Sequence, residues 1–287
     1  MIIIITAYRI LGLLMIALAI LWQGSCSGSA INSTTPATPP PTPVTEKSAS
    51  SMKLFVPSYF NSGDYKPDGT GEWNKLIASL NEGDVLIINP NSGPGKAAED
   101  GFKKVIAEAK SKGIVIFAYV HTILDDKHRR PEAEIQKEID RYKEFYGLVN
   151  IFFDEFTENQ GGHDATLPFY TRLCEYVHKN GGISTLNPGA VIDESYAKIT
   201  DKIVAFESPN ARYKQYGPDH WLWSSKPEYH EKVVHLILEA SNDEWKAAVA
   251  QARSANAGYV YVTELKEPGV WDKLATYWPE EVLEIRK

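Results

Sequence analysis

Two adjacent carboxylates, Asp154 and Glu155, stand directly after the apolar run 149–153. Such a run is typical of a buried strand, so both acids should lie at the carboxyl end of that strand. Glu207 follows a second apolar run, 202–206, in the same way. Cleavage of a glycosidic bond needs one carboxylic acid that protonates the leaving oxygen and one carboxylate that acts as nucleophile or activates water. The three acids therefore predict the catalytic residues of a glycoside hydrolase.

The adjacency of the first two acids constrains their roles. Neighbouring residues of a strand point to opposite faces, so Asp154 and Glu155 cannot both face the same centre. We expect one of them to reach the substrate and the other to orient or tune it, with Glu207 as the opposing acid. The sequence leaves open which of the pair contacts the substrate. A nearby like charge and apolar surroundings should raise the pKa of the general acid toward neutrality.

These acids need a scaffold in which strand ends converge. Apolar runs typical of strands occur near 53–58, 84–89, 114–120, 149–154, 183–187, 202–207, 232–239 and 258–264. Helical patterns separate them: one over about 97–112, one that opens at Pro131 and stops at Gly147, and one with Ser241 as N-cap and Glu244 completing a capping box. Eight such units predict an α/β fold, a (β/α)8 TIM barrel. A doubly wound sheet is the lesser alternative, because no glycine-rich dinucleotide fingerprint follows the first strand.

In such a barrel the residues at the carboxyl ends of the strands share one mouth. Besides the three acids, the polar residues expected there are Tyr59, Asn89, His121, Asn187, Glu239 and Glu264. Aromatic rings can stack on sugars, so Tyr119, Trp221 and Trp223 are further candidates for substrate binding. Polar strand ends can simply be solvated, and each aromatic residue can equally be core packing. That explanation is weaker for Asp154 and Glu155, because charges flanked by aromatic residues are costly unless they are paired or used.

The first fifty residues do not have the pattern of a folded domain. Arg9 precedes the apolar stretch 10–22, which has the length of a signal-peptide core, and small residues then lead to Cys26. This ending resembles the lipobox of prokaryotic lipoproteins, in which the cysteine becomes lipidated, although Gln23 stands where leucine is usual. Lipid anchoring in a membrane, plain secretion and an uncleaved signal anchor stay open. All three place the rest of the chain outside the cytoplasm.

We therefore expect a signal peptide at 1–26, a Ser/Thr/Pro-rich linker at 27–51 and a glycoside hydrolase domain at 52–287. A net charge of −7 argues against a nucleic-acid-binding protein, which would need a basic surface. Cys174 lies in a helical apolar pattern and should be a small buried residue rather than half of a disulfide. The seven histidines show no metal-binding spacing, so we expect no metal and no cofactor. We expect a monomer.

Six short motifs occur in an order that resembles a known family. They are 89–95 (NPNSGPG), 119–122 (YVHT), 151–155 (IFFDE), 187–189 (NPG), 206–208 (FES) and 261–264 (YVTE). Together they resemble the spherulin-4 (spherulation-specific family 4) proteins, glycoside hydrolase family 135, over residues 53–280. The resemblance implies a barrel endo-α-1,4-N-acetylgalactosaminidase acting on galactosaminogalactan-type exopolysaccharide. It also implies that Asp154, Glu155 and Glu207 are the essential acids, whereas Glu264 stands where many relatives should have aspartate.

Two alternatives to this polysaccharide substrate and activity stay open. A prokaryotic cell surface, which the N-terminus indicates, can present a different envelope or biofilm glycan as the natural polymer. The protein can also be a non-catalytic surface protein that binds glycan. Three carboxylates at one mouth argue against the second alternative, since a protein that has lost catalysis has no need to keep them together.

Overall fold

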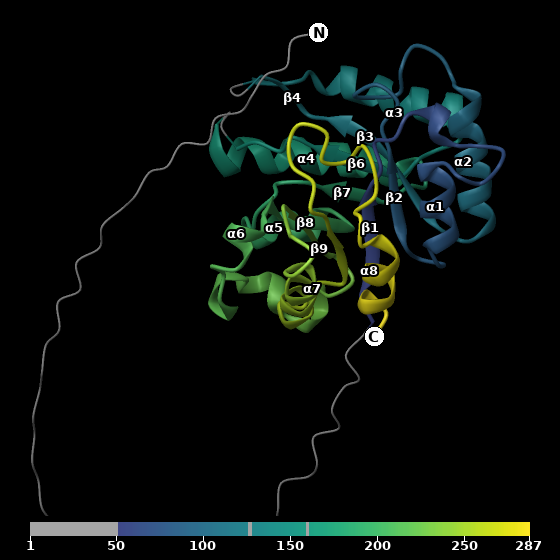
Figure 1. Cartoon of the computed structure of the whole chain (residues 1–287). Helices are drawn as coiled ribbons and strands as arrows, with labels where there is room; N and C mark the ends of the chain where they lie inside the picture. The colour runs from purple at the N-terminus through teal and green to yellow at the C-terminus, as the bar shows by residue number, and fades with distance from the viewer. Residues whose placement is uncertain (1–50, 126–127, 159–160) are drawn as a thin grey trace, which may run out of the picture. The chain divides into compact units, whose positions relative to one another are not determined.

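The computed structural model describes residues 51–125, 128–158 and 161–287; the predicted signal peptide, Cys26 and nearly all of the predicted linker lie outside the described residues. Eight parallel strands form a closed barrel in the order β1-β10-β9-β8-β7-β6-β3-β2 (Figure 1). They are β1 (Lys53–Pro57), β2 (Val85–Ile88), β3 (Val115–His121), β6 (Ile151–Asp154), β7 (Ser184–Leu186), β8 (Lys202–Pro209), β9 (Val233–Leu238) and β10 (Tyr259–Val262). The eight predicted strands and the (β/α)8 fold are therefore confirmed.

Helices on the outside of the barrel connect successive strands, and a last helix, α8, follows β10. They are α1 (Glu72–Ser79), α2 (Asp100–Ser111), α3 (Glu132–Tyr146), α4 (Gly162–Lys179), α5 (Glu194–Ile199), α6 (Asn210–Tyr213), α7 (Trp245–Ser254) and α8 (Trp278–Ile285). As predicted, α3 starts after Pro131 and ends at Gly147, whose φ of 61° suits glycine. Among the described helices, none is both long and apolar enough to cross a membrane.

The predicted start of α7 is wrong by three residues. The N-cap is Glu244 rather than Ser241. The Glu244 carboxylate does accept from the backbone N–H of Ser241, at 3.2 Å, as one half of a capping box requires. The Ser241 hydroxyl, however, donates to that same carboxylate at 2.8 Å instead of accepting from the helix. A turn therefore precedes the helix, and the helix begins at Trp245.

The barrel interior is filled by aromatic side chains. Phe55 on β1 lies 5.9 Å from Phe117 on β3 and 6.0 Å from Phe152 on β6, measured between ring centroids. All three are almost completely buried. Burying a side chain of this size contributes about 1.5–3 kcal/mol each, so these rings form a stable floor beneath the mouth. Cys174 is buried and free, as predicted.

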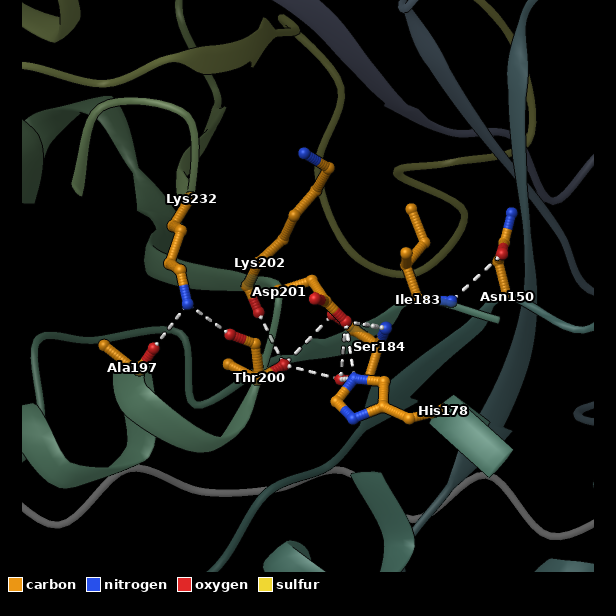
Figure 2. Close-up of polar contacts among 9 residues, drawn as sticks. All are labelled: Asn150, His178, Ile183, Ser184, Ala197, Thr200, Asp201, Lys202 and Lys232. Atoms are coloured by element: carbon orange, nitrogen blue, oxygen red, sulfur yellow. Dashed lines mark hydrogen bonds and ion pairs between the residues drawn. The ribbon is translucent and has the colours of Figure 1, made fainter. Parts of the chain in front are cut away.

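A polar network closes the opposite end of the barrel, where the strands begin (Figure 2). Asp201 accepts from the backbone N–H of Ser184 at 2.7 Å and from His178 Nε2 at 2.8 Å. Lys232 Nζ donates to the Thr200 carbonyl at 2.7 Å, just after α5 ends. Polar residues at this end of a barrel serve stability, whereas those at the mouth serve chemistry.

Both ends of the described barrel lie at this strand-start end. β1 begins at Lys53, and the backbone N–H of Lys53 donates to the Gly258 carbonyl, which precedes β10. After α8, Arg286 Nη2 donates to the Asp84 carboxylate at 3.0 Å, directly before β2 begins. The chain therefore enters and leaves the barrel on the side away from the mouth.

Within the described residues, four 3₁₀ helices and one hairpin lie in the connections between the barrel strands. The hairpin pairs β4 (Ile123–Asp125) with β5 (His128–Arg129) after β3. The 3₁₀ helices are η1 (Ser62–Asp64), η2 (Pro218–His220), η3 (Leu222–Ser225) and η4 (Pro227–Tyr229). The last three follow one another between α6 and β9; Trp223 lies in η3, and Trp221 lies between η2 and η3.

Candidate active site

Three neighbouring strands bring two of the predicted acids together. Asp154 ends β6, Asn187 follows β7, and Glu207 lies in β8. Asn187 Nδ2 donates to Asp154 Oδ1 at 2.6 Å and to Glu207 Oε2 at 2.5 Å. The oxygen of the same amide accepts from the backbone N–H of Gly189 at 3.1 Å, which fixes the amide with its NH₂ group toward the acids. Asn187 thus bridges the two carboxyl groups.

An irregularity in β8 positions Glu207. The pairing of β8 with β9 shifts register between Val204 and Phe206, as in a bulge. A bulge re-aims the side chains that follow it. The backbone N–H of Glu207 then donates to the carbonyl of Gly189 at 3.0 Å. Gly189 has a φ of 62°, a conformation that favours glycine. The loop after β7 and the bulge in β8 therefore both fix the position of Glu207.

The electrostatics of the two bridged acids differ. Burial raises the pKa of Glu207, the charge of Asp154 adds to this effect, and together they bring it to about 8. Burial also raises the pKa of Asp154, but hydrogen bonds from the Glu155 backbone, Asn187 and Tyr119 oppose that rise. At neutral pH Glu207 therefore keeps its proton while Asp154 is the better stabilised anion. One member of the pair meets the expectation of a general acid with a raised pKa.

Glu155 does not join this cluster. Its φ is 57°, a left-handed conformation that costs a non-glycine residue about 1–2 kcal/mol. The Thr122 hydroxyl donates to the carbonyls of Asp154 at 2.9 Å and Glu155 at 3.1 Å, which holds this turn. Desolvation and the Asp154 charge raise the pKa of Glu155 to about 7, against the effect of Arg130. Glu155 is exposed, so solvent weakens these effects.

Two predicted tyrosines lie beside the acids. The Tyr119 hydroxyl hydrogen-bonds to Asp154, and burial together with that carboxylate raises the pKa of Tyr119. Its ring is almost fully buried and packs edge-to-face on Tyr59, with centroids 5.4 Å apart. Burial and the Asp154 charge also raise the pKa of Tyr59. Tyr119 therefore supports Asp154 and does not present a ring face for sugar stacking.

His121, also predicted, is held by residues that the sequence did not indicate. His121 Nδ1 donates to the Ser92 carbonyl at 3.1 Å, and Arg130 Nη1 donates to the His121 carbonyl at 3.0 Å. Arg130 is buried and forms a two-pronged ion pair with Glu138 on α3, at 2.9 and 2.7 Å. Burial and Arg130 lower the pKa of His121, so the ring is neutral. Arg130 follows the hairpin strand β5 and Glu138 lies on α3, so neither stands at the end of a barrel strand, where the sequence pattern predicts functional residues.

A fourth acid, Glu267, was also missed. It lies in the loop after β10, and its charge raises the pKa of Glu207. Burial, Asp272 and Asp154 in turn raise the pKa of Glu267. A position five residues beyond the end of a strand carries no sequence signal, because nothing fixes how far such a loop folds back over the mouth.

Three other predicted residues lie apart from the acid cluster. Asn89 Oδ1 accepts from the Gly93 N–H at 3.1 Å, so Asn89 folds its own loop. Glu239 and Glu264 line a separate open cavity of about 570 Å³ that follows β9 and β10. Glu264 Oε1 accepts there from the backbone N–H of Thr276 at 2.8 Å.

The prediction that Trp221 and Trp223 form sugar-stacking subsites is wrong. Trp221 is 2% exposed and stacks on His235 with centroids 4.4 Å apart. Trp223 is 6% exposed, and its Nε1 donates to the Ile192 carbonyl at 2.6 Å. Trp221 packs on His235 of β9 and near Phe206 of β8, and Trp223 packs on Tyr229, so burial of apolar area outweighs display of either ring to solvent.

The fold and the site define a (β/α)8-barrel protein with a carboxylate centre at the carboxyl ends of its strands. The sequence pattern of spherulation-specific family 4 matches residues 53–285. Because this match covers most of the chain, the protein belongs to spherulation-specific family 4. This agrees with the resemblance found in the sequence motifs.

Similar proteins include one relative by sequence and several by structure. Spherulin-4 of Physarum polycephalum is 27% identical over 235 residues, covering 77% of this chain and 66% of its own length, so the chain spans just under two thirds of it. The crystal structure of Aspergillus clavatus Sph3 in complex with GalNAc has a TM-score of 0.67 at 23% identity, covering 83% of this chain and 98% of that one. A family 18 chitinase from Pseudoalteromonas aurantia has a TM-score of 0.50 at 14% identity, covering 80% and 99%. These structural likenesses establish the fold.

Proposed function

We propose that the protein is a glycoside hydrolase that cleaves α-1,4-linked N-acetylgalactosamine within an exopolysaccharide. One observation carries the proposal: a single amide, Asn187 Nδ2, holds one oxygen of Asp154 and one of Glu207 in a common mouth. Such a pair supplies the two carboxyl groups that glycosidic cleavage requires. The GalNAc in the similar Aspergillus clavatus structure supports the choice of sugar.

In this mechanism Glu207 is the general acid. Its carboxylic proton passes to the glycosidic oxygen as the C1–O bond breaks, and Asp154 Oδ forms a bond to C1. Glu207 then takes a proton from water, the water oxygen bonds to C1, and Asp154 leaves with its electron pair. The pKa of Glu207, raised to about 8 by burial and by Asp154, keeps the acid protonated until the first step.

The spacing of the acids favours retention of configuration at C1. The two bridged oxygens lie 2.6 and 2.5 Å from one nitrogen. They can therefore be no more than about 5 Å apart, which is near the separation of retaining enzymes and below that of inverting ones. Proton NMR of the first product released from polymer checks this, because retention gives the α-anomer before mutarotation.

Glu155 has a supporting role in this proposal. It lies next to the nucleophile but outside the bridge, in a strained turn held by Thr122. The Asp154 charge raises the pKa of Glu155, and the exposure of Glu155 allows it to contact a sugar that Asp154 attacks. The supporting acid predicted from the sequence is thus Glu155 and the reacting one Asp154.

Two substitutions test the acid pair. Glu207→Gln and Asp154→Asn should each abolish release of oligosaccharides from N-acetylgalactosamine polymer, measured by mass spectrometry, with little change in thermal unfolding. Glu175→Gln on the exposed surface of α4 is the matched control and should retain full turnover. Near-wild-type turnover in either test variant would mean that the assigned roles are wrong.

Two other readings lead to different results in the same assay. A different envelope or biofilm glycan as substrate predicts oligosaccharides from another purified polymer and none from the N-acetylgalactosamine chain. A non-catalytic glycan-binding protein predicts retention of polymer with no oligosaccharide released after long incubation. The buried Asp154–Asn187–Glu207 bridge favours catalysis, because a binding surface has no use for a carboxyl group with a strongly raised pKa.

We also propose that the protein acts outside the cytoplasm, with residues 1–26 as signal peptide and 27–51 as a linker to the catalytic domain. Cys26 is the site of lipidation in this proposal, with an uncleaved signal anchor or plain secretion as alternatives. Expression of the full chain and of its Cys26→Ala variant, followed by detergent phase separation, distinguishes them. Loss of the detergent-phase protein in the variant alone indicates lipidation.

A further inference from the structure

Two open cavities lie side by side on the rim of the barrel mouth, between the loops that follow β9 and β10. One has a volume of about 520 Å³ and the other about 570 Å³. Both fall within the range of about 300–1,000 Å³ that is common for ligand sites. Adjacent residues, Ser241 and Asn242, line one cavity each, and the Thr276–Glu264 hydrogen bond of 2.8 Å joins their other walls. We call the two together the rim cavities.

The first rim cavity rests on two nearly buried aromatic rings, so the contacts it offers a ligand come mainly from its exposed polar edges. Trp245 and Tyr277 stack with ring centroids 5.0 Å apart and planes at 11°, and Tyr277 donates its hydroxyl to the Ala240 carbonyl at 2.9 Å. Around these rings lie the exposed side chains of Asn242, Asp243, Lys246, Thr276 and Glu280. A firm wall edged with amide, carboxylate, hydroxyl and ammonium groups is suited to a ligand rich in hydroxyls.

The charges of the rim cavities are mixed rather than of one sign. Carboxylates come from Glu239, Asp243, Glu264 and Glu280, and ammonium groups come from Lys246, Lys266 and Lys273. Carboxylates accept hydrogen bonds and ammonium groups donate them, whereas a sugar hydroxyl does both. A strongly anionic ligand would meet repulsion from the four carboxylates, and a strongly cationic one from the three ammonium groups. The lining therefore fits an uncharged polar chain, such as one of N-acetylated hexosamines.

The rim cavities lead to the acid pair through one short loop. Lys266 and Pro268 line the second cavity, and Glu267 between them acts electrostatically on both Glu207 and Asp154. The same loop is fixed to the end of β1, since the Tyr59 N–H donates to the Trp271 carbonyl at 3.1 Å. In Figure 1 this yellow loop runs between β10 and α8. A chain that occupies the acid pair can therefore continue into the rim cavities.

We propose that the rim cavities bind further sugar units of the polymer whose cleavage is proposed above, an uncharged N-acetylhexosamine chain, and so commit the protein to long substrates. This inference rests on the proposed function for its choice of ligand. The rim cavities contact units remote from the bond that breaks, so they contribute to binding of the polymer rather than to the chemical step.

The variant Asn242→Ala/Lys246→Ala tests the proposal, because both residues are exposed and their loss leaves the core intact. We expect KM for N-acetylgalactosamine polymer to rise about tenfold with kcat nearly constant, as loss of two hydrogen bonds predicts. A short oligosaccharide should be affected much less. Thr276→Tyr, which fills the cavity instead of removing contacts, should act in the same direction. Lys179→Ala at the end of α4, on the far side of the barrel, is the matched control and should change neither substrate.

Several results would overturn the proposal. One is an equal effect of the double variant on polymer and short oligosaccharide; another is no effect on either. A third is strong loss of polymer binding at 1 M salt, which would mean that charge rather than hydrogen bonding holds the chain.

Failure of the proposed function is distinguishable from failure of the rim cavities. If the wild-type protein cleaves nothing, affinity electrophoresis in gels that contain the polymer still measures binding. Retardation of the wild type that is lost in Asn242→Ala/Lys246→Ala but kept in Lys179→Ala would support the rim cavities as a glycan site without catalysis. Equal migration of all three proteins, with and without polymer, would reject both proposals.

Discussion

Replacement of Asn187 by alanine should move the acidic limb of the pH–activity profile upward. Asn187 donates at 2.6 Å to Asp154 and at 2.5 Å to Glu207, and a donor of this kind stabilises the ionised form of a carboxyl group. Its loss therefore makes ionisation harder and raises the apparent pKa of the pair. The direction is unambiguous because Asn187 lowers the pKa of both acids.

The size of this shift follows from the strength of the bonds. A hydrogen bond to a charged group contributes about 1.5–3 kcal/mol, and one pKa unit corresponds to about 1.36 kcal/mol. The lower apparent pKa of the coupled pair should rise by about 1–2 units in Asn187→Ala. The alkaline limb, which reports ionisation of the protonated acid Glu207, should also rise, because Asn187 stabilises the ionised form of Glu207 as well.

The assay is the rate of reducing-end release from polymer between pH 3 and 10, for wild type, Asn187→Ala and Asn150→Ala. Asn150 is the matched control, because its side chain also joins strands through two hydrogen bonds, to Ile116 and Ile183, each of 3.1 Å. It lies at the opposite end of the barrel, where Figure 2 shows its bond to Ile183. The Asn150→Ala variant should have a lower melting temperature than the wild type, with neither limb of its pH–activity profile moved. An acidic limb that stays in place or moves downward in Asn187→Ala would refute the bridge as the element that sets these pKa values.

Two further predictions concern stability. Leu222→Gly should stabilise the fold by about 0.5–1 kcal/mol in urea unfolding, because Leu222 has a φ of 47° and is 65% exposed, so relief of strain exceeds the loss of contacts; a decrease in stability would show that its side chain has a partner in the fold. Glu281→Gln should gain stability relative to wild type as the pH rises. The carboxyl of Glu281 is fully buried, accepts from the Val262 N–H at 2.7 Å and has a pKa well above its usual range, mainly because of burial. The folded state therefore holds a proton that the unfolded state releases above about pH 4.3, and the wild type loses up to about 1.4 kcal/mol per pH unit from there upward. Unfolding in urea at pH 5 and pH 7 should show a larger advantage of Glu281→Gln at pH 7, and equal differences at both pH values would contradict this account.

Strand positions were predictable from the sequence because a strand that is buried on both faces has apolar residues at successive positions. The runs at 233–238 and 259–262 are buried throughout, and each is followed directly by a polar residue, Glu239 and Thr263 respectively. The acid pair was predictable for the same reason, since parallel strands bring Asp154 and Glu207 to one end. Asp154 and Glu155 do separate, but Glu155 lies beyond the end of β6 in a left-handed turn, so alternation along the strand is not the cause.

Contacts made by loops were not predictable. Glu267 approaches Glu207 only because the loop after β10 folds over the mouth, and Arg130 reaches His121 from the segment after a hairpin. The tryptophans near residue 222 were misjudged because a segment without helical or strand periodicity can still be buried as a lid on the outer side of a strand. Composition alone does not distinguish an exposed aromatic platform from such a cover.

The chain enters at Lys53 and leaves after α8 on the same side of the barrel, away from the acids. A protein held by either end therefore presents its mouth outward. Attachment to a bead, a sensor chip or a fusion partner through residues before 51 or after 287 should leave access for a polymer undiminished. The domain can therefore be immobilised on a support with its barrel mouth directed away from that support and toward a glycan layer.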